Sequence, residues 1–155
     1  LARDSDLDPA ALIAAATREL WEETGLLVGA PDPRAPKMQA PQGWRGYIAT
    51  GHLPDGETTR FLFRAITPPG RPRRFDARFF LIDAAALRND PDDLSRAEDE
   101  LGHLHWVALD TVRGLDMPFI TEVVLAELAA HLDGRAAQGV PFFDNRHEVS
   151  RFWRL

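Results

Sequence analysis

Three glutamates near the start of the chain, Glu19, Glu22 and Glu23, have the spacing of one helix face. Residues at i, i+3 and i+4 lie on the same side of an α-helix, so the three carboxylates come within roughly one turn. Such close like charges repel each other, and a hard divalent cation that takes oxygen ligands would offset the repulsion. Arg18, four residues before Glu22, is placed to orient it. The alternative is a solvated acidic face, because acidic triplets are common on helices.

The element that must carry these carboxylates is a helix predicted for residues 8–24. Asp8 is a favoured N-cap residue, Pro9 suits the first helical position, and Gly25 supplies a stop at the C-terminal end. An Ala- and Leu-rich run fills the interior, which predicts about four to five helical turns. Leu12, Ala16 and Leu20 form an apolar stripe that adjoins the acidic face.

Residues 18–26 read Arg-Glu-Leu-Trp-Glu-Glu-Thr-Gly-Leu. The string resembles the second half of the Nudix box, Arg-Glu-apolar-x-Glu-Glu-x-Gly-apolar, and matches it throughout. The resemblance implies a Nudix hydrolase in which Glu19, Glu22 and Glu23 hold Mg²⁺ or Mn²⁺. It also implies that Arg18 fixes a carboxylate by hydrogen bonding.

The first half of the box is not matched, because Asp4 and Ala10 stand where the family has Gly and Glu. Either the box is degraded, or an insertion separates the Gly-rich loop from the helix. The second arrangement occurs in a subgroup that resembles the peroxisomal coenzyme A diphosphatases. Family members place strands and the Gly-rich loop before the helix, whereas this chain begins with Leu1 directly ahead of it. We therefore expect residues 1–155 to be a single Nudix domain that lacks its N-terminal strands and forms the C-terminal portion of a longer protein.

The composition is that of one ordinary globular domain. The chain has 155 residues, 45% of them hydrophobic and 27% charged, and no Cys, which excludes disulfides and thiolate sites. A net charge of −6 argues against nucleic acid as a partner. No segment has the length of a membrane span, so we expect a cytoplasmic protein with a small-molecule substrate and no membrane partner. A homodimer is left open.

The remaining pattern predicts strands followed by a second helix. Residues 26–28 are expected to start a strand, residues 29–43 to form a Pro-rich loop, and residues 60–67 and 75–83 to form paired strands. A further strand is expected over residues 101–109.

A helix is predicted from Met117 or Pro118 to Leu132, with Asp116 as a possible N-cap. It should cover the sheet opposite the first helix, and residues 139–155 should dock as a strand or tail. The order predicts an α/β/α sandwich over a mixed sheet, the class to which the resemblance adds the name Nudix.

Arginines near the second strand are candidate substrate contacts. Arg71, Arg73 and Arg74 suit a phosphate-rich ligand, because one guanidinium group can bind two phosphate oxygens at once. The alternative is that they are solvated arginines of a loop. Asp76 and Arg78 are either an ion pair at a rim or a polar pair facing the substrate. The surrounding Arg-Phe-Asp-x-Arg-Phe-Phe stretch resembles the coenzyme A-related subgroup, so Arg73, Arg74 and Arg78 are predicted to bind substrate.

Many Nudix enzymes use one more Glu from a loop outside the box. Glu100, six residues before Trp106, is the first candidate for this catalytic role and Glu98 the second; an acidic loop end is the alternative. Trp44 and Tyr47 either stack on a ligand or pack in the core.

Two functions are expected from these features. The first is a Mg²⁺- or Mn²⁺-dependent hydrolase that cleaves the pyrophosphate bond of a nucleoside diphosphate linked to another group, such as a coenzyme A derivative. The second is a Nudix-fold module that binds a nucleotide ligand without turnover, an alternative motivated by Asp4 and Ala10.

Overall fold

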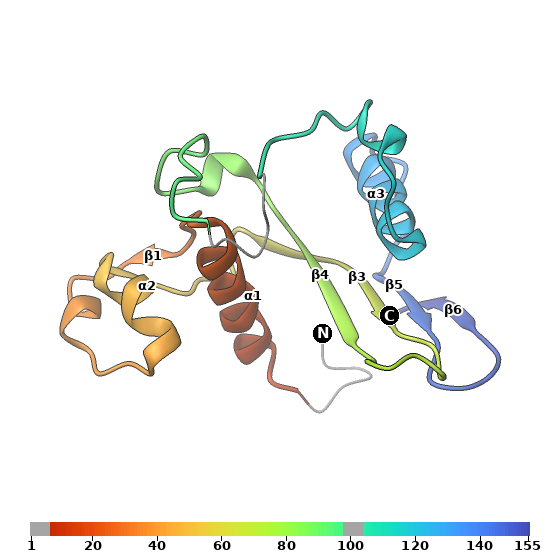
Figure 1. Ribbon diagram of the computed structural model, residues 1–155, viewed down its shortest axis with the longest axis horizontal. Coiled ribbons are helices and arrows are strands. Elements are labelled where there is room, and N and C mark those ends of the chain that lie inside the picture. The colour runs from red at the N-terminus through yellow and green to blue at the C-terminus, as the bar shows by residue number, and fades with distance from the viewer. Residues whose placement is uncertain (1–6, 98–103) are drawn as a thin grey trace.

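The computed structural model describes residues 7–97 and 104–155 and shows a mixed α/β protein with two sheets (Figure 1). The α-helices are α1 (Pro9–Thr24), α2 (Arg45–Ala49) and α3 (Phe119–Leu132). The strands are β1 (Ala30–Pro31), β2 (His52–Leu53), β3 (Thr59–Ile66), β4 (Asp76–Ile82), β5 (Pro141–Asp144) and β6 (Arg151–Arg154). Short 3₁₀ turns are η1 (Ala35–Lys37), η2 (Gln42–Trp44), η3 (Ala84–Ala86) and η5 (Val112–Gly114).

Helix α1 begins and ends where its capping residues predict. The Asp8 carboxylate accepts a hydrogen bond from the Ala10 amide at 3.0 Å, which satisfies one free amide of the first turn. At the other end Gly25 adopts a φ of 74°, a conformation that favours glycine, and its amide donates to the Trp21 carbonyl at 2.9 Å. The predicted boundaries of this helix are confirmed.

The main sheet has the strand order β4-β3-β5-β6. Strands β3 and β4 are antiparallel, from Thr59 opposite Ile82 to Ile66 opposite Asp76, which confirms the predicted pairing. The C-terminal segment supplies β5, parallel to β3, and β6, antiparallel to β5, so it docks on the sheet as expected. Strands β1 and β2 form a separate antiparallel pair.

Helix α3 packs on β3 through apolar side chains. Val124 is buried against Leu62, Phe63 and Ala65 of the strand. A second cluster joins Leu27 to the turn and helix at residues 35–48, and Trp21 of α1 packs against it. Figure 1 shows α1 and α2 apart from α3, with β3 and β4 running between them. Within the described ranges no helix has both the length and the apolar character of a membrane span.

Residues 26–28 do not start a strand, contrary to prediction. The Leu27 amide donates to the Asn89 side chain at 2.8 Å, and the Leu27 carbonyl accepts from the Arg88 amide at 2.8 Å. A distant loop therefore takes the backbone groups that a strand ladder would use. The Pro-rich segment 29–43 is also more ordered than a plain loop, since it holds β1, η1 and η2.

Two further boundaries differ from prediction. Residues 104–109 form no strand, and the Trp106 indole instead donates to the Pro91 carbonyl at 2.9 Å; residues 101–103 lie outside the described part. Helix α3 has Pro118 rather than Asp116 at its N-cap. The Pro118 carbonyl accepts from the Thr121 amide at 2.8 Å, which starts the helix two residues later than an Asp116 cap would.

Phe142 is a critical core residue, because its side chain is fully buried between Trp153 and the Arg64 guanidinium. Phe142→Ala should lower the free energy of unfolding by about 3–5 kcal/mol, since it leaves a cavity in the sheet. Urea denaturation measures the change. The control Phe75→Ala removes a side chain that is 62% exposed and should change stability by less than about 0.5 kcal/mol. Equal losses in the two variants would contradict this account.

Candidate functional site

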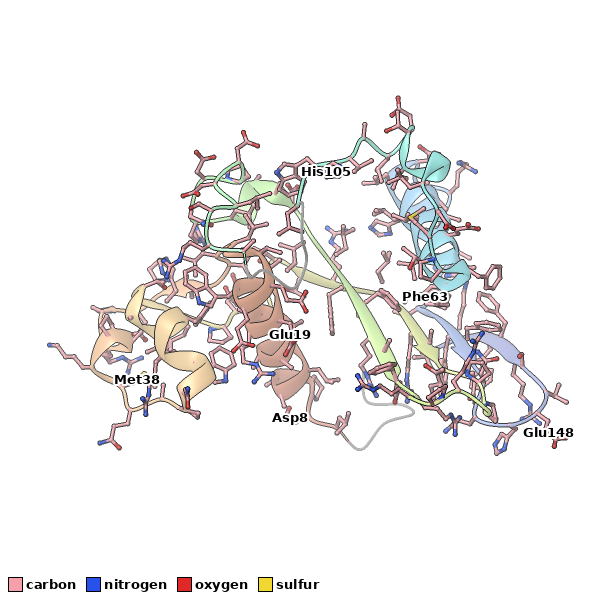
Figure 2. All side chains as sticks on the ribbon, viewed as in Figure 1. Asp8, Glu19, Met38, Phe63, His105 and Glu148 are labelled. Atoms are coloured by element: carbon pink, nitrogen blue, oxygen red, sulfur yellow. The ribbon has the colours of Figure 1, made fainter. Side chains whose placement is uncertain are left out.

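The acidic face of α1 is arranged around Arg18. Its Nη2 lies 2.5 Å from Oε1 of Glu19, and its Nε lies 3.6 Å from Oε2 of Glu22. Arg18 thus lies within ion-pair distance of Glu22, and Glu19 shares the same guanidinium. Glu23, the third predicted carboxylate, is exposed on the helix. Figure 2 shows Glu19 partway along α1.

These carboxylates remain accessible to ligands. The side chains of Glu19 and Glu22 are 52% and 32% exposed. Carboxylate oxygens suit Mg²⁺ and Mn²⁺, and Mg²⁺ is usually bound by one or two carboxylates together with water and substrate phosphates. The donor chemistry therefore fits such a cation, because each carboxylate has a second oxygen besides the one nearest Arg18. Across residues 7–97 and 104–155, no three His, Cys, Asp or Glu side chains are grouped as in a preformed metal cage.

The turn η2 lies beside the acidic face of α1 and forms one wall of the candidate site. A Cβ atom built on Gly43 would lie 2.7 Å from Oε1 of Glu22 and 3.6 Å from Nη1 of Arg18. On the next turn of the chain, a Cβ on Gly46 would lie 3.4 Å from the Trp21 indole nitrogen. The sequence offered no signal for this contact, since Gly43 reads only as part of a loop.

Trp44 and Tyr47 are packing residues in this structure. Their rings meet edge to face, with centroids 5.4 Å apart, and Tyr47 is fully buried. The Tyr47 hydroxyl donates to the Val28 carbonyl at 2.6 Å. Burial, aided by the negative charge of Asp55, raises the pKa of Tyr47 to about 12, so the phenol stays neutral. Of the two interpretations, core packing describes Tyr47.

The segment before Glu98 packs on the C-terminal end of α1. The Arg96 guanidinium lies over the Trp21 ring, 4.8 Å from its centroid. The Asn89 amide group donates to the Gly25 carbonyl at 3.0 Å. Glu98 and Glu100 themselves lie outside the described residues, so their predicted catalytic role stays a prediction.

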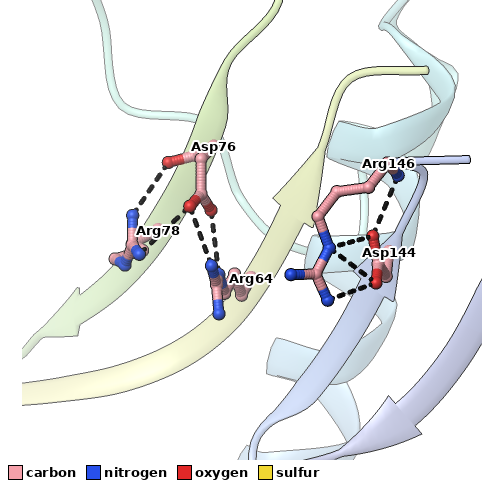
Figure 3. Close-up of polar contacts among 5 residues, drawn as sticks. All are labelled: Arg64, Asp76, Arg78, Asp144 and Arg146. Carbon is pink, nitrogen blue, oxygen red and sulfur yellow. Dashed lines mark hydrogen bonds and ion pairs between the residues drawn. The ribbon is translucent and has the colours of Figure 1, made fainter. Parts of the chain in front are cut away.

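Asp76 and Arg78 form an ion pair that also includes Arg64 (Figure 3). The Asp76 carboxylate accepts from Arg64 at 2.8 Å and from Arg78 at 3.1 Å. Burial alone would raise the pKa of Asp76, but the hydrogen bond from Arg64 and the two positive charges outweigh it and lower that pKa. The guanidinium of Arg78, a predicted substrate contact, is thus engaged with Asp76.

The other predicted substrate arginines lie on the connection between β3 and β4. Arg71 and Arg73 are exposed. Arg74 donates to the Thr67 carbonyl at 3.0 Å and to the Asn145 carbonyl at 3.3 Å. Figure 2 shows Glu148, on the loop after β5 at this end of the sheet, well apart from Glu19 of α1. The hydrogen bonds described for Arg74 and Arg78 go to Thr67, Asn145 and Asp76, not to the α1 carboxylates.

A separate hollow of about 770 Å³ lies where β3, η3 and the end of α3 meet. Arg60, Arg88 and His131 are among the residues that line it, and Arg60 Nη1 lies 3.3 Å from His131 Nε2. Its volume is in the range of small-ligand sites. Its lining carries the carboxylates of Glu57 and Asp83 as well as the two guanidinium groups, so its charge is mixed. The sequence pattern did not indicate this hollow, because its residues come from distant segments.

No family model, curated protein or solved structure matches this chain. The candidate site is therefore described by its own residues. It consists of the carboxylates of α1 with Arg18, the wall formed by η2, and the segment at residues 88–97 that docks on the end of the helix.

The lowered pKa of Asp76 predicts a pH-dependent contribution to stability. A carboxylate whose pKa is lower in the folded state stabilises the fold above its unfolded pKa of about 4, and this contribution disappears as the pH falls through the folded pKa. Asp76→Asn should therefore be less stable than wild type by about 1–3 kcal/mol at pH 7, and the difference should be smaller at pH 2. Urea denaturation at both pH values measures it. The exposed control Asp92→Asn should show no such difference at either pH.

Proposed function

We propose that this chain is a Nudix-type pyrophosphohydrolase that acts with Mg²⁺ or Mn²⁺. The proposed substrate is a nucleoside diphosphate linked to another group, such as a coenzyme A derivative. One observation carries the proposal: the Nudix-like string at residues 18–26 covers the last turns of α1 and its Gly25 cap, with Arg18 paired to both Glu19 and Glu22. The proposed fold is the α/β/α sandwich of that family.

The proposed reaction needs charge neutralisation and a positioned water, because pyrophosphate is densely negative and a poor electrophile. A divalent cation supplies both when it is bound, by offsetting charge on the phosphate oxygens and by acidifying water. Glu19, Glu22 and Glu23 would hold it. Arg18 holds Glu19 by a hydrogen bond and Glu22 by an ion pair, which reduces the rearrangement needed when the ligand arrives.

A general base completes the proposed site. Glu100, or Glu98 in its place, would take the proton from the attacking water. The placement of the preceding segment supports this assignment, since Arg96 packs on Trp21, three residues after Arg18 in the same helix.

The arginines at the β3–β4 connection are proposed to contact the distant part of the substrate. They lie apart from α1, so they suit an elongated ligand with phosphate groups at more than one position. Arg73 and Arg74 would bind such phosphates, because guanidinium groups match phosphate geometry. Arg78 would contribute positive charge while it remains paired with Asp76.

A hydrolysis assay tests the proposal directly. The protein, prepared with its full native chain, is incubated with coenzyme A, acyl-coenzyme A, NADH, ADP-ribose or nucleoside triphosphates, with and without Mg²⁺ or Mn²⁺. The expected result is cleavage of one class only when the metal is present. Absence of cleavage by a folded protein across the whole panel would overturn the hydrolase.

Removing a carboxylate charge from α1 should abolish most of the activity. Glu22→Gln and Glu23→Gln should each reduce turnover by at least about 10²-fold, because a metal-binding carboxylate contributes several kcal/mol to the transition state. The fold should be retained, since both side chains are at least partly exposed. Glu122→Gln is the matched control, an exposed helical glutamate on α3, and should keep the wild-type rate. Unchanged rates in both α1 variants would rule out this site.

A binding module without turnover is the second candidate function. The hollow lined by Arg60 and Arg88 favours it, because its volume suits a small ligand and no residue of α1 lines it. Calorimetric titration with ADP-ribose and coenzyme A separates the two functions. Binding that Arg60→Gln and Arg88→Gln abolish, with no cleavage, would support the module.

A further inference from the structure

Gly43 lies against the carboxylate end of Glu22. A Cβ atom at this position would sit 2.7 Å from Oε1 of Glu22, closer than real Cβ contacts allow. It would also lie 3.6 Å from Nη1 and 3.8 Å from Cδ of Arg18. The missing side chain therefore leaves room for the ion pair between Arg18 and Glu22.

The backbone of Gly43 does not itself require glycine. Six glycines in the described chain have a positive φ, and Gly43 is not among them. An L-residue can adopt its conformation, so the restriction at this position is one of space. The clash is with the flexible end of a side chain rather than with backbone, so a larger residue would displace Glu22 before it disturbed the fold.

The η2 segment that carries Gly43 is held in place by the packing of its neighbours. Trp44, the next residue, packs edge to face on the buried Tyr47, whose hydroxyl is bonded to the Val28 carbonyl. One turn later, Gly46 faces the indole nitrogen of Trp21 on α1. Because this segment is held at several points, the carboxylate of Glu22 must move when Gly43 gains a side chain.

We propose that Gly43 is a positioning residue that keeps the Glu22 carboxylate beside Arg18, where the divalent cation of the proposed reaction binds. The inference rests on the proposed function. It adds a residue outside the α1 motif that determines how tightly the cation is held. Residues that position metal ligands typically contribute 10–100-fold to metal affinity.

The test compares Mn²⁺ binding, measured by electron paramagnetic resonance, in wild type, Gly43→Ala and Gly46→Ala. Gly43→Ala should bind Mn²⁺ at least about 10-fold more weakly and keep the wild-type melting temperature. Gly46→Ala is the matched control, because Gly46 faces the same helix from the adjoining α2 but meets Trp21 instead of a carboxylate. It should bind Mn²⁺ as wild type does.

A double-variant cycle shows whether Gly43 acts through Glu22. In a Glu22→Ala background the added Gly43→Ala change should cause no further loss of Mn²⁺ affinity, because the displaced carboxylate is already gone. An equal loss in both backgrounds would overturn the inference. So would wild-type Mn²⁺ affinity in Gly43→Ala, or a melting temperature lowered in Gly43→Ala alone. A wild-type protein that binds no Mn²⁺ would instead overturn the proposed function on which the inference rests.

Discussion

The buried guanidinium of Arg64 is the constraint on which the main sheet depends. Its side chain is only 6% exposed, and a charge at that depth is costly unless it is paired and hydrogen-bonded. Arg64 meets this requirement through Asp76 on β4 and through the ring of Phe142 on β5, 4.3 Å from its carbon Cζ. One central side chain thus links three adjacent strands. The order β4-β3-β5 is the arrangement in which both partners are within its reach.

Features of this fold that depend on neighbouring residues were predictable from the sequence. Asp8 and Gly25 determine the ends of α1 by local hydrogen bonds and local backbone conformation, and both were recognised. The pairing of β3 with β4 follows from two apolar runs separated by a Pro-Gly turn. Features that depend on distant residues were missed. Residues 26–28 gave a strand-like pattern, but Asn89, 62 positions from Leu27, takes the backbone amide.

In the candidate site, too, the local features were predictable from the sequence and the features that depend on distant residues were not. Glu22 shares a helix face with Arg18 at i−4 and with Glu19 at i−3, so these two proximities followed from spacing, whereas the contact between the adjacent Arg18 and Glu19 did not. Gly43 reaches the same face through tertiary packing, which no spacing rule describes. Arg78 was chosen for its charge, yet its partner Asp76 sits two residues away on the same strand, and the sequence pattern left open whether the pair faces a rim or a ligand.

The parallel pairing of β3 with β5 has a consequence for how the chain folds. Arg64 lies opposite Phe142 in that ladder, a separation of 142 − 64 = 78 positions, so the ladder encloses β4 and α3 in one long loop. Closing a long loop costs entropy before the contacts it brings can compensate, and such topologies fold slowly. During synthesis, β3 and β4 emerge from the ribosome well before Phe142 is made. Until the last strands are made, one edge of β3 has no partner strand and Arg64 lacks its contact with Phe142. During this period the nascent chain is accessible to chaperones.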